Sequence, residues 1–390
     1  MTFTVRPQHN LDDHSDSAVR KSQETARRTT AKDGKAAERT PRKAGFRMPA
    51  EWEPHEATWI GWPYNRTDWP GKFATIPWVY GEIVRKIAPG EIVRIIVNSQ
   101  THEAQARRVL TSVGVDLTRV EFFHIPTNRG WTRDFGPLFV RRESKQTEVA
   151  VVQFRFNAWA KYRDWKKDDL VPERAAAALG CPLFPARINN CDVVLEGGAI
   201  DVNGRGTLIT TEECLLDQRV QPRNPGLSRE EIESVLSDYL GATNVLWLNR
   251  GIEGDDTHGH IDDICRFVDQ RTVIACREKN SHDYNYRVLE ENFERLLASQ
   301  LEDGSGIEVI SLPMPEPLVF KGRRLPASYA NFYIANAAVL APTFNDPNDR
   351  IALGTLSELI TDRPVVGVHA VDLVWGLGTI HCMTQQQPGA

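Results

Sequence analysis

Glu91-Ile-Val-Arg-Ile-Ile-Val-Asn98 is the stretch that decides the fold class. Its β-branched apolar residues are typical of a buried strand. From Thr101 to about Leu110, apolar residues stand among Glu and Arg at helical spacing, which predicts a helix directly after that strand. A chain that alternates strands and helices in this way is expected to adopt an α/β fold.

The alternation continues along the chain. Ser228-Arg-Glu-Glu231 forms a capping box that opens a helix, and Gly241 closes that helix. No repeat of fixed period is visible, although a repeated ββαβ unit fits the order of elements. Further helices are predicted at 285–299 and 350–360, and strands at 120–125, 136–141, 148–154, 245–248, 264–268, 272–276, 307–310, 332–342 and 365–369.

Residues 1–44 differ in composition from everything after them. They hold many Arg, Lys, Ser, Thr and Ala residues, few large apolar residues and no Trp. Such a segment buries too little apolar surface to offset the entropy lost on ordering, so we predict a disordered, polar and basic tail. Because no linker interrupts the rest of the chain, we predict a single domain over residues 45–390.

Composition argues against several classes of partner and location. A formal net charge of −5 and a pI near 6.1 make a nucleic-acid partner unexpected. No apolar run approaches the roughly 18 to 20 residues of a membrane span, and the N-terminus lacks the apolar core of a secretory signal. The six cysteines are scattered without a C-x-x-C pair, which is typical of a reduced, cytoplasmic protein.

Trp375-Gly-Leu-Gly-Thr-Ile-His-Cys382-Met-Thr-Gln-Gln-Gln-Pro388 places a His beside a Cys and before a run of amides. Gly376 and Gly378 allow backbone and ligand to approach closely, and the glutamines can donate and accept hydrogen bonds. These features favour a docked active-site segment in which Cys382 is a thiolate nucleophile. The alternative is a small buried hydrophobic residue, which is the commoner role of a lone Cys.

Two acidic residues stand beside predicted strands. Asp134 lies between an aromatic residue and a Gly-Pro turn, where it can face a cavity, cap the turn or pair with Arg133. Glu196 is followed by two glycines and flanked by apolar residues, where a carboxylate is costly to bury unless it is paired. We expect Glu196 to lie inside a pocket, and the alternative is the solvent face of a bulged strand.

Gly254-Asp-Asp-Thr-His-Gly-His-Ile-Asp-Asp-Ile-Cys265 is the densest polar stretch. His258, His260 and Asp262 stand two residues apart, so on a strand they would share a face and, with Cys265, resemble a metal cluster. The other interpretation is a general acid/base His260 surrounded by carboxylates. We prefer acid/base chemistry without a metal, because no second His-rich stretch offers the remaining ligands.

One Cys, one His and the carboxylates of Asp134, Glu196 and Asp262 together suit a small cationic substrate. Carboxylates bind the planar N–H fork of a guanidinium in a bidentate manner. The central carbon of a guanidinium is only weakly electrophilic, so its reaction needs a strong nucleophile and a proton donor for the leaving amine.

These residues stand in motifs that resemble the agmatine deiminase and bacterial-type peptidylarginine deiminase family of guanidino-group-modifying enzymes. The resemblance covers nearly all of the chain after residue 45. The motifs, in order, are Met48-Pro-Ala-Glu-Trp-Glu-Pro-His55, Gly61-Trp-Pro63, Trp131-Thr-Arg-Asp134, Asn157-Ala-Trp159, Leu195-Glu-Gly-Gly198, Thr210-Thr-Glu-Glu-Cys-Leu-Leu216, Gly259-His-Ile-Asp262, Ala327-Ser-Tyr-Ala-Asn-Phe-Tyr-Ile-Ala-Asn336 and Ile380-His-Cys-Met-Thr-Gln-Gln-Gln-Pro388.

The resemblance implies a fold and a reaction. The fold is a fivefold pseudo-symmetric α/β propeller, or pentein, of ββαβ units around a polar channel. The reaction is hydrolysis of a guanidino group to a ureido group and ammonia, without a metal or organic cofactor. Members of the family often assemble as dimers or larger, so a homo-oligomer is expected.

The resemblance also implies the roles of individual residues. Cys382 would attack the guanidinium carbon to give a thiouronium adduct, and His260 would protonate the departing ammonia and then activate water. An imidazolium near a thiol is expected to lower the thiol pKa. Asp134 and Asp262 would hold the guanidinium nitrogens, and Glu196 would orient His260 or the substrate. Further substrate contacts are expected at Trp131, Trp159 and Gly378.

Departures from the family pattern leave the choice of guanidine open. His258 stands where close agmatine deiminases usually carry Asn, and Leu377 and Thr379 stand where those enzymes usually carry Gly and Asn. Agmatine, converted to N-carbamoylputrescine for polyamine synthesis, is the preferred prediction. The alternative is arginine or a peptide ending in arginine, whose carboxylate would need a cationic anchor such as Arg129, Arg133 or Arg323.

Two other functions are alternatives to deimination. An amidinotransferase on the same scaffold would pass the amidino group to an amine instead of water. A non-catalytic binding protein is disfavoured, because a binder has no need of a thiol at Cys382.

Overall fold

The computed structural model describes residues 40–143 and 147–389. Most of the predicted tail, residues 1–39, therefore lies outside the described residues. Residues 41–390 form one compact unit. This unit begins slightly before the predicted boundary, because η2 (Arg42–Ala44) is closed by Gly45 in the left-handed conformation and its last carbonyl accepts a hydrogen bond from Arg142 at 2.8 Å. Among the described residues, no helix is both long and apolar enough to cross a bilayer.

Five sheets of the described chain share one pattern of connections. In each sheet an antiparallel pair of strands is followed by a parallel pair, and a helix connects the two parallel strands. The sheets are β20–β1–β2–β3 (Thr384–Pro388, His55–Gly61, Ile92–Val97, Val120–His124), β4–β5–β6 (Leu138–Arg142, Glu148–Gln153, Leu183–Pro185), β9–β10–β11 (Asp201–Val202, Thr207–Thr211, Asn244–Leu248), β12–β13–β14 (Cys265–Phe267, Thr272–Arg277, Glu308–Pro313) and β17–β18–β19 (Tyr333–Ile334, Val339–Thr343, Val365–His369).

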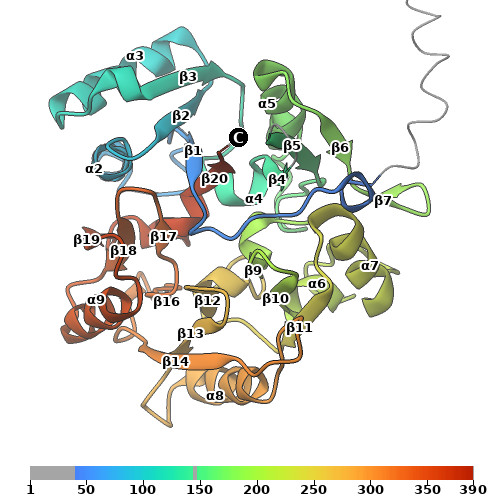
Figure 1. Cartoon of the computed structure of the whole chain (residues 1–390). Helices are drawn as coiled ribbons and strands as arrows, with labels where there is room; N and C mark the ends of the chain where they lie inside the picture. Colours follow the sequence, from blue (N-terminus) through green and yellow to red (C-terminus); the bar gives the residue numbers. More distant parts are fainter. Residues whose placement is uncertain (1–39, 144–146, 390) are drawn as a thin grey trace, which may run out of the picture. The chain divides into compact units, whose positions relative to one another are not determined.

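Helices cover the outer sides of these sheets. In Figure 1 they lie around the outside of the unit, while the first strands of the sheets lie nearer its middle. The helices are α2 (Ile76–Ile87), α3 (Gln100–Ser112), α5 (Val171–Leu179), α7 (Arg229–Leu240), α8 (Tyr284–Leu297) and α9 (Pro347–Leu359), with the short α6 (Glu212–Leu216) directly after β10. Smaller elements are the hairpins β7–β8 (Arg187–Ile188, Cys191–Asp192) and β15–β16 (Val319–Phe320, Arg323–Arg324), and the turns η3 (Leu117–Arg119), η4 (Asp168–Leu170) and η7 (Val374–Gly376).

The predicted strand at residues 91–98 is confirmed as β2. It is parallel to β1 on one side and β3 on the other, and its residues from Val93 to Val97 are buried. Helices α2 and α3 both contact β2, and this contact explains why the strand is apolar nearly throughout. The capping box of Ser228 and Glu231 and the left-handed Gly241 also delimit α7 as predicted.

Single helical turns stand just before the first strand of four of these sheets. They are α4 (Thr132–Phe135) before β4, η5 (Gly197–Ala199) before β9, η6 (Ile261–Asp263) before β12 and η8 (His381–Met383) before β20. The turn α4 contacts η5 and η8, and η5 contacts η6. The fold thus brings equivalent positions of successive sheets together, although they are far apart in the sequence.

Candidate active site

A cavity of about 430 Å³ has Cys382 in its wall, with Trp131, Asp134 and Trp159 beside it. Each of these four residues was predicted to act on or contact the substrate. Charged side chains also line the cavity, and they are Asp68, Arg129, Asp164, Asp256 and Arg323.

Three predicted site residues converge over Gly198. A Cβ atom at Gly198 would lie 2.6 Å from His260 Nδ1, 2.8 Å from Asp134 Oδ1 and 3.1 Å from Asp262 Oδ2. All three side chains are buried. Because this position is glycine, the three side chains can approach one another this closely, and even one added methyl group would displace them.

Asp134 is held by neutral donors. Trp159 Nε1 donates to its Oδ2 at 2.9 Å, and the backbone N–H of Gly198 donates to its Oδ1 at 3.2 Å. The alternative pairing with Arg133 is wrong, because the Arg133 guanidinium binds Glu51 instead. Burial raises the pKa of Asp134 to about 7, and the charge of His260 only partly opposes this rise.

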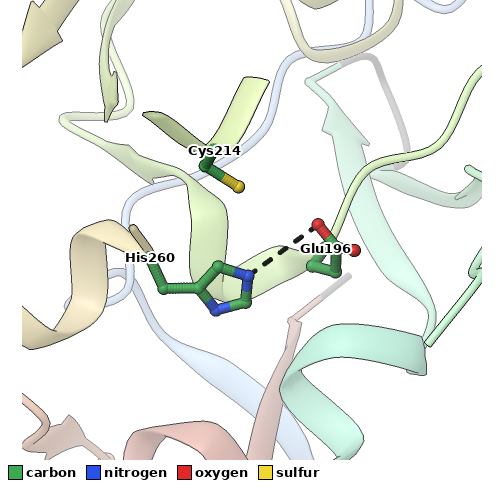
Figure 2. A group of neighbouring side chains, drawn as sticks. All are labelled: Glu196, Cys214 and His260. Carbon is green, nitrogen blue, oxygen red and sulfur yellow. Dashed lines mark ion pairs between the residues drawn. The ribbon is translucent and has the colours of Figure 1, made fainter. Parts of the chain in front are cut away.

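Glu196 and His260 form a charged pair close to Asp134. Arg223 Nε donates to Glu196 Oε1 at 3.0 Å, while Glu196 Oε2 lies 3.8 Å from His260 Nε2 (Figure 2). Burial opposes ionisation of Glu196, but Arg223 and His260 outweigh it and lower the pKa of Glu196 to about 2. Burial likewise opposes protonation of His260, but Asp134, Cys214 and Glu196 raise the pKa of His260 well above its usual value. A carboxylate therefore faces an imidazolium, and the bulged-strand alternative for Glu196 is wrong.

Cys382 lies in η8 with its sulfur among polar groups. Asn331 Nδ2 donates to Sγ at 3.1 Å, and Sγ lies 3.6 Å from Asp262 Oδ2. Burial raises the pKa of the Cys382 thiol well above its usual value, and Asp262, Asp263 and Asp134 raise it further. The pKa of this thiol is therefore raised, whereas a lowered pKa was expected, because burial and the carboxylates dominate.

Sequence reasoning missed the group that holds Asp262. His381 Nδ1 lies 2.7 Å from Asp262 Oδ2, and His381 Nε2 lies 2.9 Å from Glu51 Oε2. Glu51 in turn binds Arg133 at 3.1 Å and Arg266 at 3.0 Å. The adjacency of His381 to the cysteine was a visible signal, but nothing in the sequence linked either residue to Glu51.

The metal cluster considered from the sequence is not assembled. His258 has φ of 66°, and its Nε2 lies 2.9 Å from Asp217 Oδ2, away from His260. Cys265 belongs to β12 and packs in the hydrophobic core. The predicted strand spacing is wrong here, because His260 precedes the turn η6 and does not lie in a strand.

The glycines around Cys382 fit tightly against aromatic rings. A Cβ at Gly378 would lie 3.0 Å from both Cys382 Cβ and the Trp131 ring. A Cβ at Gly376 would lie 2.4 Å from Trp69 Nε1, and the Trp69 and Trp131 ring centroids are 5.0 Å apart. These close contacts fix the segment before the cysteine against the cavity wall.

The three departures from the family pattern differ in position. Leu377 lines the cavity and adopts φ of 72°, a left-handed conformation that favours glycine. Thr379 Oγ1 donates to Asn331 Oδ1 at 2.7 Å, so it supports the residue that contacts the Cys382 sulfur. Of the three departures, Leu377 is the one named among the residues that line the cavity.

Comparisons with known proteins agree with this geometry. Residues 47–388 match the model of the Porphyromonas-type peptidyl-arginine deiminase family. The agmatine deiminase of Medicago truncatula is 39% identical over 385 residues, covering 90% of this chain and 98% of that protein. The solved agmatine deiminase of Enterococcus faecalis is 32% identical with a TM-score of 0.82, covering 90% of this chain and 98% of its own. An agmatine deiminase of C. jejuni with substrate bound is 29% identical with a TM-score of 0.77, covering 88% and 96%.

Proposed function

The chain belongs to the Porphyromonas-type peptidyl-arginine deiminase family, and from that premise we propose that it hydrolyses agmatine to N-carbamoylputrescine and ammonia. One observation carries the proposal: His260, Asp134 and Asp262 converge over Gly198, next to a cavity whose wall contains Cys382. The similarity to agmatine deiminases over nearly the whole chain supports agmatine as the guanidine.

Asp134 and Asp262 bind the guanidinium in this proposal. Asp262 Oδ1 is buried and has no hydrogen-bond partner among the described residues, so it can accept from a substrate N–H. Asp134 already accepts neutral donors, and a cation would stabilise its charged form. Trp131 and Trp159 flank the alkyl chain, and Gly378 allows the substrate to approach the sulfur.

The first half of the reaction removes ammonia. The Cys382 thiolate donates an electron pair to the guanidinium carbon, and a C–S bond forms. His260, an imidazolium at neutral pH, gives a proton to one terminal nitrogen. The C–N bond then breaks, ammonia leaves, and a thiouronium remains on Cys382.

The second half releases the ureido product. The now neutral His260 takes a proton from water, and the water oxygen attacks the thiouronium carbon. The C–S bond breaks, the electron pair returns to sulfur, and the hydroxyl oxygen releases its proton to the solvent as the carbonyl of the ureido group forms. Glu196, held by Arg223, keeps His260 in place and stabilises its charged form through both halves.

The thiol needs the substrate for its activation. Burial and three carboxylates raise the pKa of Cys382 well above its usual value. A bound guanidinium places a positive charge beside Asp134 and Asp262, which reverses the local balance of charge and favours release of the thiol proton to the solvent, leaving the thiolate. Nucleophile formation is thereby coupled to the binding of a cation.

The arginines that could anchor a substrate carboxylate are already paired with acidic side chains. Arg129 binds Asp68 and Asp164, Arg133 binds Glu51, and Arg323 lies 2.7 Å from Asp256. A substrate carboxylate would have to displace these partners, which favours agmatine over arginine.

The five similarly connected sheets support a second proposal, about the fold. We infer that they are the five blades of a pseudo-symmetric propeller of ββαβ units. The single turns before the first strands then occupy equivalent positions and face a common channel.

Product analysis tests the proposed function. Agmatine, free arginine and a peptide ending in arginine are incubated with the chain and with Cys382→Ala, and ammonia and ureido products are measured. We expect products from agmatine, and none from Cys382→Ala although it folds normally. Preference for either arginine substrate would overturn the assignment of agmatine, and activity of Cys382→Ala would overturn the nucleophile.

A further inference from the structure

We propose that Glu196, Cys214 and His260 form a binding site for Zn²⁺, and that the metal inhibits the enzyme by occupying the imidazole nitrogen that faces Glu196. The proposal goes beyond the proposed function, because binding itself requires no turnover. The three side chains come from three separate parts of the sequence and face a common space (Figure 2).

The donor atoms have the spacing and chemistry that zinc requires. The carboxylate oxygen, the sulfur and the imidazole nitrogen all lie within 4.8 Å of one another. Glu196 Oε2 and His260 Nε2 are 3.8 Å apart. Tetrahedral N and O ligands at 2.0–2.1 Å from zinc lie about 3.3 Å apart, so small side-chain rotations complete the site.

Two of the donors are buried without partners. Neither Glu196 Oε2 nor His260 Nε2 has a hydrogen-bond partner among the described residues, although both side chains are buried. Buried polar atoms usually have a hydrogen-bond partner, whereas these two atoms face each other as an ion pair at 3.8 Å, so a metal ion can bind between them. Cys214 is a buried free thiol, and no disulfide removes it from coordination.

The surroundings would support the metal. Arg223 holds the other oxygen of Glu196 at 3.0 Å and leaves Oε2 to the metal. His260 Nδ1 lies 3.7 Å from Asp134 Oδ1 and 4.0 Å from Asp262 Oδ1. A zinc-bound imidazole commonly donates its other N–H to such a carboxylate, which fixes the tautomer and strengthens binding. The Glu196 carboxylate and a Cys214 thiolate together neutralise the charge of Zn²⁺.

Zinc at this position would block the acid/base step. Coordination at Nε2 requires neutral His260 and deprotonated Cys214, so it displaces their protons. The remaining His260 proton lies on Nδ1, the nitrogen near Asp134 and Asp262. Giving that proton to the departing ammonia would leave a metal-bound imidazolate in place of a neutral imidazole, so zinc-bound His260 is a much weaker acid than the imidazolium.

A spectroscopic experiment tests the site without turnover. Co²⁺ is added to the Cys382→Ala protein, which lacks the catalytic thiol, and thiolate-to-cobalt charge-transfer absorption is recorded in the near ultraviolet. We expect a band that added Zn²⁺ abolishes by displacement. The band should be absent from Cys382→Ala/Cys214→Ala. It should persist in Cys382→Ala/Cys276→Ala, whose altered cysteine is buried beside Ser328. Circular dichroism checks that each variant is folded.

No band in Cys382→Ala, or a band that survives loss of Cys214, would overturn the proposal. The inhibition is tested on agmatine turnover by the full chain with and without ZnCl₂. Since loss of an outer-shell partner alone costs about 10–100-fold in metal affinity, Cys214→Ala should raise the half-inhibiting Zn²⁺ concentration by at least about tenfold. Equal zinc sensitivity of the unsubstituted chain and of Cys214→Ala would contradict inhibition through this site. If agmatine is not hydrolysed, the proposed function fails, while the cobalt band still decides the metal site.

Discussion

His381 Nδ1 lies 2.7 Å from Asp262 Oδ2, the carboxylate oxygen that also lies 3.6 Å from the Cys382 sulfur. The other ring nitrogen of His381 lies 2.9 Å from Glu51. The imidazole therefore lies between two buried carboxylates, and it holds Asp262 in the orientation in which it can receive a guanidinium. His381 is a positioning residue in this arrangement.

Replacement of His381 by Ala should weaken both the fold and substrate binding. Removing one partner of buried charges costs about 3 kcal/mol or more, so the urea midpoint should fall. Asp262 loses its orientation, so KM for agmatine should rise more than kcat falls. His55→Ala is the matched control, because His55 also pairs with a buried carboxylate, Glu91, at 3.1 Å but does not line the cavity. An unchanged KM in His381→Ala would contradict the positioning role.

Gly198→Ala should abolish guanidinium binding while the protein stays folded. The added methyl would lie 2.6 Å from His260 Nδ1 and 2.8 Å from Asp134 Oδ1. Because the methyl would displace the His260 and Asp134 side chains, kcat/KM should drop by about 100-fold or more, the scale at which small misplacements act. Gly354→Ala, a helical position with no neighbour within 4 Å, is the control. Activity of Gly198→Ala near that of the control would show that the substrate binds elsewhere.

Binding of agmatine should strengthen as the pH rises through about 7, because burial raises the pKa of Asp134 to about 7. Below that pH Asp134 is neutral and attracts the cation less, so KM is higher. In Asp134→Asn this dependence should disappear, and KM should be high throughout. The raised pKa of Asp134 also affects stability. Between about pH 4 and 7, Asp134 holds a proton in the folded chain but not in the unfolded chain. The contribution of Asp134 to the free energy of unfolding therefore declines as the pH rises from about 4 to 7. A pH-independent KM in the unsubstituted chain would contradict this prediction.

Leu377→Gly should change substrate selection more than stability. The left-handed conformation at φ of 72° costs Leu roughly 1–2 kcal/mol, while Gly loses about 0.5–1 kcal/mol more backbone entropy on folding, so the two terms nearly cancel. The smaller residue opens the cavity wall, and turnover of a peptide ending in arginine should rise relative to agmatine. Competition between the two substrates in one reaction measures this ratio. An unchanged ratio would mean that Leu377 does not restrict the cavity.

Chelation should not inactivate the protein. The proposed reaction needs no metal, so dialysis against EDTA should leave agmatine turnover unchanged, or increase it where Zn²⁺ had occupied the site at His260. Activity is measured before dialysis, after dialysis, and after addition of ZnCl₂. Loss of activity on chelation and its recovery with metal would argue instead for a catalytic metal.

Local patterns in the sequence predicted the elements well. Apolar runs identified β2, and a capping box with a glycine stop identified α7, because these signals depend on neighbouring residues. The strands β1, β10 and β20 and the helices α2 and α5 were not predicted. The three glutamines of β20 were interpreted as ligand-binding amides, whereas all three are buried and pair with β1. The homo-oligomer and the cytoplasmic location stay predictions.

The candidate site was predicted through its motifs, and its supporting residues were not. The motif residues around Cys382, His260 and Asp134 do lie together in the structure. Arg223 and Glu51 were missed because each meets its partner only after the chain has folded. Glu51 and His381, for example, are 330 positions apart, and no local pattern links them.

The pairing of β1 with β20 has a consequence for how the protein becomes active. Trp59 in β1 donates to Gln387 in β20 at 2.8 Å, across 328 positions of sequence. Closing so long a loop is entropically costly and slow, so we expect this pairing to form late in folding. Cys382 lies directly before β20, and its position depends on that last contact. During refolding, helical and sheet signals should therefore appear before enzymatic activity. In a partly folded chain the Cys382 thiol would not yet be positioned, and it would not react with guanidines.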